Sequence, residues 1–233
     1  MSIAENVAIV RDQMAEAAVK AGREPGEILL CAATKMNGAD AIRQAVAAGV
    51  DACGENRVQE LLEKLPQGAY TGAPVHFIGH LQKNKAKQVV GAVDLIESVD
   101  SPELLALIGR LARERGIRQD ILLEVNIGGE EAKSGAAPEA LAELAAAAAD
   151  DPGVRLRGLM AIPPVAEKPG ESRRYFEKMY QLYVDIKAKK YDNSVIDCLS
   201  MGMSGDFADA IAAGATMVRI GTAIFGARDY ARR

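Results

Sequence analysis

The stretch Ile28-Leu29-Leu30-Cys31-Ala32-Ala33 is a short run of apolar residues without polar residues at alternate positions. A strand that is covered on both faces has this pattern, and such strands are typical of parallel sheets. A segment with helical spacing, Ala39–Ala48, follows the run, and a second apolar run, Val50–Gly54, comes next. The order strand, helix, strand is the repeating unit of proteins with a parallel sheet.

The same unit recurs along the whole chain. Apolar runs predict strands over Ile28–Ala33, Val50–Gly54, Val75–Gly79, Leu95–Val99, Ile121–Ile127, Leu156–Ile162, Cys198–Gly202 and Met217–Gly221. Helical spacing predicts helices over Ile3–Lys20, Ala39–Ala48, Arg57–Leu65, Pro102–Arg115, Pro138–Ala149, Ser172–Lys189 and Asp206–Ala213. In the first of these helices the apolar stripe consists of Ile3, Val7, Val10, Met14 and Ala17 or Ala18.

Eight such strands, with a helix after nearly every one, fit a chain of 233 residues as a single (β/α)8 TIM barrel. The helix over Ile3–Lys20 is then an extra N-terminal helix. A doubly wound open sheet is the alternative, although six or seven strands would suit it better. Because no proline- or serine-rich linker divides the sequence, we expect one domain over residues 1–233.

Composition narrows the class of protein. Hydrophobic residues make up 49 % and charged residues 26 % of the chain, as in ordinary globular proteins. The 28 lysine and arginine residues against 32 acidic ones give a net charge of −4, which argues against nucleic acid as a partner. The longest non-polar block, Leu144–Ala149, is far below the ~20 residues of a membrane span, and the amino terminus does not resemble a signal peptide. We therefore expect no membrane partner.

The cysteines and histidines do not have the spacing of a metal site. Cys31, Cys53 and Cys198 lie far apart, and His76 and His80 are the two histidines of the sequence. We therefore expect no structural zinc, no disulfide framework and a reducing cytoplasm. Cys53 and Cys198 fall within predicted strands, so we expect them to be small buried hydrophobic residues. His76 also falls within a predicted strand, where a buried, hydrogen-bonded histidine is expected.

In a barrel of this kind, functional groups lie at the carboxyl ends of the strands and in the loops that follow. Lys35 comes directly after the first predicted strand. Desolvation by apolar walls favours the neutral amine, which is the form that attacks a carbonyl to make a Schiff base. The interpretation without function is a lysine on the surface at the end of a strand.

Two turns after the last two predicted strands have the character of a phosphate site. Ser200-Met201-Gly202-Met203-Ser204-Gly205-Asp206 leads from a strand to a helix, and Ser204 can cap that helix or bind a phosphate. Arg219-Ile220-Gly221-Thr222 adds a second turn with a hydroxyl group. The loops after strands seven and eight are the usual phosphate site of a TIM barrel. A phosphate opposite Lys35 makes pyridoxal 5′-phosphate (PLP) a specific candidate ligand. An isomerase acting on a sugar phosphate is another candidate, with Glu55 as its base.

Several stretches between residues 28 and 230 carry a family resemblance. They are Ala32-Ala33-Thr34-Lys35, Gly54-Glu55-Asn56-Arg57-Val58-Gln59-Glu60, His76-Phe77-Ile78-Gly79-His80-Leu81-Gln82-Lys83-Asn84-Lys85, Val125-Asn126-Ile127, Lys133-Ser134-Gly135, Arg157-Gly158-Leu159-Met160, Leu199-Ser200-Met201-Gly202-Met203-Ser204 and Val218-Arg219-Ile220-Gly221-Thr222-Ala223-Ile224-Phe225-Gly226. With them the chain resembles the pyridoxal 5′-phosphate homeostasis proteins, which are similar to the barrel domain of alanine racemases.

The resemblance implies a cofactor site with assigned roles. Lys35 would carry PLP as a Schiff base, Arg219 would face the pyridine nitrogen, and Asn56 would lie beside the ring. Around the phosphate the resemblance places Ser200, Gly202, Ser204, Gly221 and Thr222. The function it implies is non-catalytic: storage, buffering or delivery of PLP, with PLP-dependent apoenzymes as recipients and a monomer or weak dimer as the assembly.

An amino-acid racemase is the alternative function. Racemisation needs a base on each face of the cofactor, and alanine racemases take the second one from an additional carboxyl-terminal domain. The sequence ends at Arg233, soon after the last predicted strand, so we expect no such domain. An arginine at the pyridine nitrogen also disfavours protonation of that nitrogen, which weakens the ring as an electron sink. Both points favour the carrier over the racemase.

Overall fold

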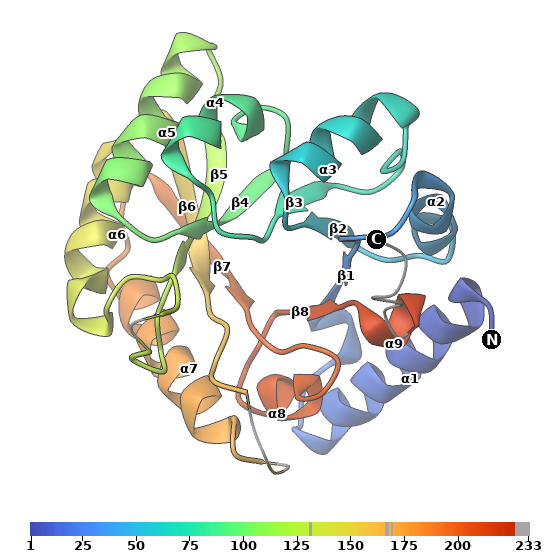
Figure 1. Ribbon diagram of the computed structural model, residues 1–233. Helices are drawn as coiled ribbons and strands as arrows, with labels where there is room; N and C mark the ends of the chain where they lie inside the picture. Colours follow the sequence, from blue (N-terminus) through green and yellow to red (C-terminus); the bar gives the residue numbers. More distant parts are fainter. Residues whose placement is uncertain (131, 166–167, 169, 227–233) are drawn as a thin grey trace.

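Eight parallel strands close into a barrel in the computed structural model, which describes residues 1–130, 132–165, 168 and 170–226 (Figure 1). In chain order the strands are β1 (Leu29–Ala33), β2 (Ala52–Glu55), β3 (Val75–Phe77), β4 (Leu95–Val99), β5 (Gln119–Glu124), β6 (Val154–Met160), β7 (Ser194–Ser200) and β8 (Met217–Ile220). β1 pairs in parallel with both β2 and β8, which closes the sheet. The prediction of a (β/α)8 barrel is confirmed, and the open sheet is excluded.

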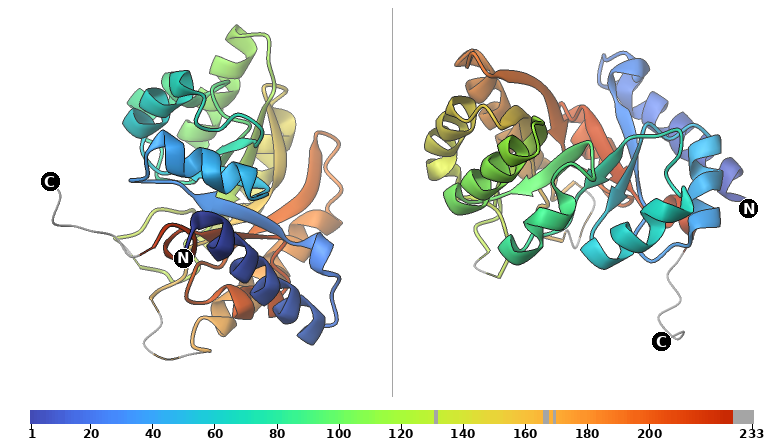
Figure 2. Two further views of the ribbon diagram at one scale, coloured as in Figure 1. Left: turned by 90° about the vertical axis from the view of Figure 1, so that its right-hand side faces the viewer. Right: turned by 90° about the horizontal axis from the view of Figure 1, so that it is seen from above.

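Helices surround the strands on the outside (Figures 1 and 2). They are α1 (Ile3–Lys20), α2 (Ala39–Ala47), α3 (Val58–Lys64), α4 (Ala86–Val89), α5 (Pro102–Glu114), α6 (Leu141–Asp150), α7 (Arg173–Ala188), α8 (Phe207–Ala212) and α9 (Thr222–Phe225). Short 3-10 turns at Pro25–Glu27, Leu65–Gln67, Lys83–Lys85 and Pro138–Ala140 complete the connections. Each connection crosses from the carboxyl end of one strand to the amino end of the next, as parallel pairing requires.

The extra helix α1 begins with a capping box, in which Ser2 and Glu5 satisfy each other's backbone N–H groups. Its buried stripe, Val7, Val10, Met14 and Ala18, packs against α8, α9 and α2, and it confirms the predicted face. The side chain of Asn6 also donates a hydrogen bond of 2.8 Å to the carbonyl of Ile224 in α9. The first helix therefore supports the segment that follows β8.

The strands bury two separate layers of side chains. The larger core lies between the strands and the helices. Inside the barrel a smaller cluster consists of Cys31, Ala52, Leu95, Leu122, Met160, Cys198 and Met217. Because strand side chains alternate between faces, the inward residues two positions later form the next layer toward the mouth of the barrel. That layer contains polar groups, namely Glu97, Glu124, Ser200 and Arg219.

The three cysteines are buried and free, as predicted for Cys53 and Cys198. Burial and the nearby Glu55 raise the pKa of Cys53 to about 12, and burial likewise raises the pKa values of Cys31 and Cys198. Such thiols are protonated at neutral pH and unreactive. They act as packing residues of the strands.

Some boundaries differ from the prediction. β7 begins at Ser194, four positions before the predicted start at Cys198, because the residues from Ser194 to Asp197 are partly exposed and include polar side chains. No apolar run marks that half of the strand. The helices α4 and α9 span four residues each, which is too short for a periodic pattern.

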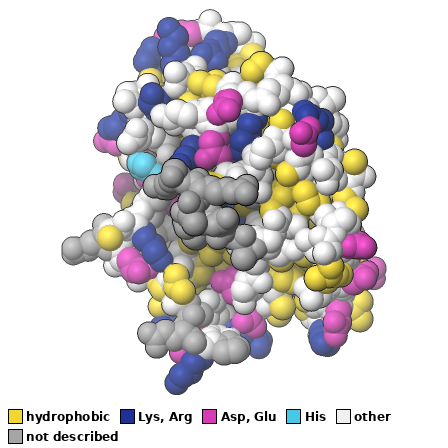
Figure 3. All heavy atoms as spheres, turned by 45° about the vertical axis from the view of Figure 1, so that its right-hand side comes forward, with side chains coloured by type: hydrophobic (Ala, Val, Ile, Leu, Met, Phe, Trp, Pro, Cys, Tyr) yellow, Lys and Arg dark blue, Asp and Glu magenta, His cyan; other side chains and the backbone are white. Residues whose placement is uncertain are grey.

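Charge is spread over the surface. Figure 3 shows acidic and basic side chains interspersed on one face of the molecule. Within the described residues, no helix has the length and apolar character that crossing a membrane requires.

Candidate functional site: a pocket at the mouth of the barrel

A pocket of about 210 Å³ opens at the carboxyl ends of the strands. Its walls come from the ends of β1 and β8 and from the loops after β2, β3, β6 and β7. The lining residues are Ala33, Lys35, Asn56, Ile78, Ile162, Met203, Ser204, Gly205, Arg219, Gly221 and Thr222. Six of the eight predicted site residues are therefore in one lining: Lys35, Asn56, Ser204, Arg219, Gly221 and Thr222.

The other two predicted residues, Ser200 and Gly202, lie beneath this lining. Ser200 is fully buried, and its hydroxyl bonds to Glu97 and Arg219 inside the barrel. Gly202 has a φ of +92°, and a Cβ there would lie 2.5 Å from the Cβ of Ala210. Its position therefore requires glycine for packing against α8. Both residues support the lining from below, and their place around a phosphate stays a prediction.

Lys35 is half-buried. Its two neighbours in the chain form hydrogen bonds with side chains from the end of β2 and from α3. The buried Thr34 donates through Oγ1 to Glu55 Oε1 at 2.6 Å, and its carbonyl accepts from Lys64 Nζ at 3.1 Å. On the other side, the N–H of Met36 donates to Glu60 Oε2 at 2.6 Å. Met36 has a φ of +63°, a backbone conformation that residues other than glycine adopt rarely. The backbone at Lys35 is thus fixed from both sides.

Glu55 does not reach the pocket. It is fully buried, and its Oε1 lies 2.7 Å from Lys64 Nζ and 3.0 Å from the hydroxyl of Tyr70. Burial and the adjacent carboxylate raise the pKa of Tyr70, which keeps its proton on the bond to Glu55. The sugar-phosphate isomerase needed Glu55 as a base at the mouth of the barrel. That expectation is wrong, because the carboxylate is turned toward α3 and held there by an ion pair.

Asn56 is positioned by a close backbone approach. A Cβ on Gly79 would lie 2.2 Å from the carbonyl oxygen of Asn56, so only glycine fits opposite it. The side-chain oxygen Oδ1 of Asn56 is buried and has no hydrogen-bond partner among the described residues. A buried amide oxygen without a partner is costly and calls for a donor. Asn56 thus offers an acceptor at the wall of the pocket.

Ser204 joins the two turns that were predicted to bind phosphate. Its Oγ accepts from the N–H of Ala223 at 3.5 Å, which links the loop after β7 to the start of α9. It does not cap α8, because the N-cap position there is Asp206. A Cβ on Gly205 would meet no atom within 4 Å, and one on Gly221 would come no closer than 3.5 Å to any neighbour. The pocket is therefore open beside these two glycines.

Arg219 forms the floor of the pocket on the β8 side. Only 3 % of its side chain is exposed, and Nη2 donates to the carbonyl of Ala161 at 2.9 Å while Nη1 donates to Ser200 Oγ at 2.5 Å. Glu97 Oε2 lies 3.8 Å from Nη1 and supplies a negative charge.

The prediction of a buried, hydrogen-bonded His76 is confirmed, since its Nδ1 lies 2.8 Å from Glu97 Oε1.

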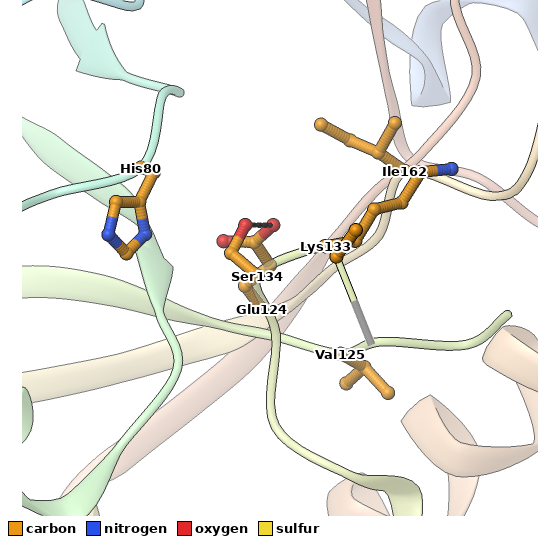
Figure 4. Close-up of a pocket in the computed structure, with 7 residues that line it drawn as sticks. His80, Glu124, Val125, Lys133, Ser134 and Ile162 are labelled. Carbon is orange, nitrogen blue, oxygen red and sulfur yellow. Dashed lines mark hydrogen bonds between the residues drawn. The ribbon is translucent and has the colours of Figure 1, made fainter. Parts of the chain in front are cut away.

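A second pocket of about 580 Å³ adjoins the first, and Ile162 lines both. Figure 4 shows His80 facing the pair formed by Ser134 and Glu124, with Lys133 near Ile162. Ser134 Oγ donates to Glu124 Oε1 at 2.8 Å, and burial raises the pKa of Glu124. The sequence analysis missed Glu124 and Glu97 because it selected groups at the carboxyl ends of the predicted strands and in the loops that follow, and these two lie in the middle of predicted strands. The signal for both is a charged residue inside an apolar strand run.

Comparison with known proteins agrees with this geometry. The model of the family described as alanine racemase, N-terminal domain, matches residues 2–229. A pyridoxal phosphate homeostasis protein of Escherichia coli strain K12 is 45 % identical over 237 residues, which cover 99 % of this chain and 99 % of that protein. The chain belongs to the pyridoxal phosphate homeostasis protein family.

Two further similar proteins extend the comparison. The pyridoxal phosphate homeostasis protein of Aquifex aeolicus is 42 % identical over 230 residues, covering 99 % of this chain and all of that protein. The structure of PipY from Synechococcus elongatus PCC7942 with PLP bound matches with a TM-score of 0.82 at 33 % identity, over 97 % of this chain and 100 % of that chain. The resemblance seen in the sequence is thereby confirmed.

Proposed function

We propose that this protein binds PLP in the pocket at the mouth of the barrel and stores, buffers or delivers it without turning it over. One observation carries the proposal: an amine, a guanidinium, an amide and two hydroxyl groups from the ends of four strands meet in one lining. These are Lys35, Arg219, Asn56, Ser204 and Thr222. The PLP-bound PipY structure, with the same fold, supports the choice of ligand.

The donors and acceptors of the pocket fit this ligand. The amide of Asn56, whose buried Oδ1 lacks a donor, offers hydrogen-bonding groups to the polar substituents of the ring. Ser204 and Thr222 offer hydroxyl groups beside Gly205 and Gly221, where the pocket is open. Arg219 has five N–H donors and no acceptor, so it can only donate to a ring nitrogen. When bound, PLP supplies an aldehyde that condenses with an amine and a ring that withdraws electrons from it.

Each residue then has a distinct task. Lys35 holds the cofactor through Nζ, Ser204, Gly221 and Thr222 hold the phosphate, and Asn56 orients the ring. Arg219 keeps its own proton and donates to the ring nitrogen, so that nitrogen stays unprotonated. The ring is thus bound in its less electron-withdrawing form. This charge arrangement supports a carrier over a racemase.

The described lining also favours the carrier. Lys35 is the one group among the described lining residues that can accept a proton from carbon, since Arg219 remains protonated. Racemisation requires a base on each face. We further propose a cytoplasmic location, PLP-dependent apoenzymes as recipients and a monomer or weak dimer as the working state. The three free, buried cysteines support a reducing compartment.

Two measurements test this proposal. Titration of the protein with PLP and with pyridoxal, followed by visible absorption, should show far tighter binding of PLP, because the phosphate contacts are lost with pyridoxal. Equal affinities would contradict the phosphate site. Separately, the loaded protein should exchange the α-protons of amino acids in deuterated water negligibly. Exchange at the rates of ordinary enzymes, about 1–10³ s⁻¹, would favour the racemase.

A further inference from the structure

A chain of buried polar side chains runs through the barrel below the pocket. It begins at Arg219, whose Nη1 lies 2.5 Å from Ser200 Oγ. Ser200 Oγ lies 2.6 Å from Glu97 Oε2, and Glu97 Oε1 lies 2.8 Å from His76 Nδ1. All four side chains are buried, and they come from β8, β7, β4 and β3. A buried carboxylate is costly to desolvate, so packing alone does not explain this series of hydrogen-bonded side chains.

The proton positions along the chain follow from the donors and acceptors. An arginine side chain only donates, so Ser200 Oγ accepts from Arg219. The single hydroxyl proton of Ser200 is then donated to Glu97 Oε2. Glu97 accepts at both oxygens when it is ionised, with His76 Nδ1–H as the second donor. Burial raises the pKa of Glu97, but His76, Arg219 and Ser200 outweigh burial and bring that pKa below its ordinary value.

The same contacts fix the guanidinium of Arg219. Two of its N–H donors are taken by Ser200 and by the carbonyl of Ala161, and Glu97 Oε2 lies 3.8 Å from Nη1. Because a guanidinium group is planar and rigid, these bonds also set the direction of its other donors. Arg219 is at the same time part of the pocket lining.

We propose that Glu97 is a positioning residue for the cofactor: acting through Ser200, it orients the Arg219 guanidinium and sets the charge that this group presents to the ring nitrogen. The inference rests on the proposed function, because it needs a pyridine ring in the pocket. Glu97 itself does not line that pocket. Its effect on the ring must therefore pass through Arg219.

Glu97→Gln is the informative change because the amide has the shape of the carboxylate but not its charge. If the amide oxygen faces His76, its N–H₂ group faces Ser200 and gives Ser200 no acceptor. If it is turned over, the N–H₂ group faces His76 Nδ1, which accepts from it only after the ring changes tautomer. In both orientations Arg219 loses its buried negative charge.

The experiment uses full-length protein loaded with PLP that carries ¹⁵N in the ring. The ¹⁵N resonance reports directly on the hydrogen bond at the ring nitrogen. We expect Glu97→Gln to move this resonance and to weaken PLP binding about tenfold. Asp120→Asn is the matched control, since the largely buried Asp120 carboxylate also bonds to arginine side chains, Arg155 and Arg157, but at the amino end of β5, away from the pocket lining. It should leave the ring resonance at the wild-type position.

A second pair of variants tests whether Glu97 acts through Arg219. In an Arg219→Gln background, Glu97→Gln should cause no further movement of the resonance. If Glu97→Gln fails to fold, Ser200→Ala interrupts the same series of hydrogen bonds and should move the resonance in the same way. An unmoved resonance in Glu97→Gln or Ser200→Ala overturns the inference. So does an additional shift caused by Glu97→Gln in the Arg219→Gln background. If wild-type protein gives no bound resonance, the proposed function itself fails, and the inference fails with it.

Discussion

Lys64 lies at the centre of the cluster that holds the backbone beside Lys35, although it does not line the pocket. Its Nζ is 2.7 Å from Glu55 Oε1, 2.9 Å from Glu60 Oε2 and 3.1 Å from the carbonyl oxygen of Thr34. Only 8 % of its side chain is exposed, and the side chain of Glu55 is not exposed at all. Lys64→Met keeps the length of the side chain and removes the ammonium group.

The magnitude follows from the partner that is left behind. Removing one member of a buried ion pair costs about 3–5 kcal/mol, because the other charge stays buried without compensation. Tyr70 and Thr34 still donate to Glu55, so we expect about 3 kcal/mol of the free energy of unfolding to be lost. The double variant Glu55→Gln/Lys64→Met removes the stranded charge as well and should recover at least half of this loss.

The loss should also reach the site. The contacts to Thr34 and to Glu60 hold the residues on both sides of Lys35, and Met36 stays in its left-handed conformation only while they do. Lys64→Met should therefore bind PLP more weakly than wild type. Urea unfolding followed by circular dichroism gives the stability, and absorption titration gives the affinity. A loss below about 1 kcal/mol, or a double variant less stable than the single one, would refute this account of the cluster.

Three further changes test other parts of the structure. Gly79→Ala should lower the free energy of unfolding by about 1–3 kcal/mol and weaken PLP binding, because the new Cβ would meet the Asn56 backbone. Gly26→Ala is the control: a Cβ there meets no atom within 4 Å, so the change should be nearly neutral in urea unfolding. Thr222→Val should weaken PLP binding roughly ten- to a hundredfold and leave pyridoxal binding unchanged; an equal loss for both ligands would argue against a phosphate contact. Burial raises the pKa of Glu124 above its ordinary 4.5, so the folded state holds the carboxyl proton more tightly than the unfolded state does. Stability therefore falls as the pH rises from the ordinary pKa through the raised one. Glu124→Gln should therefore gain more over wild type in urea unfolding at about pH 7 than at about pH 4, and the opposite order would contradict the assignment.

The barrel itself was predictable from the sequence because burial on both faces leaves continuous apolar runs. Leu95–Val99 was predicted with its observed bounds. The first half of β7 was not predictable in this way, because Ser194 and Asp197 face partly toward solvent. Such a segment becomes a strand through pairing with β6, a long-range contact that no local pattern records.

The site was predictable where strand ends decide it. Lys35 and Arg219 follow from the rule that the carboxyl ends of parallel strands meet at one mouth. The inward direction of the Ser200 side chain was missed, because adjacency to a glycine turn does not tell which way a hydroxyl points. Alternation along the strand does: Cys198 faces the interior, so Ser200 faces it too. The same step of two from Leu95 would have found Glu97.

The central claim is that PLP is held through Lys35. The most direct measurement is borohydride reduction of the PLP-loaded protein, followed by mass spectrometry of its peptides, with Lys35→Ala treated in parallel. The account predicts a pyridoxyl group on Lys35 in the wild type and no stoichiometric label in the variant. A label on Lys83, Lys85 or Lys133, with Lys35 unmodified, would contradict it.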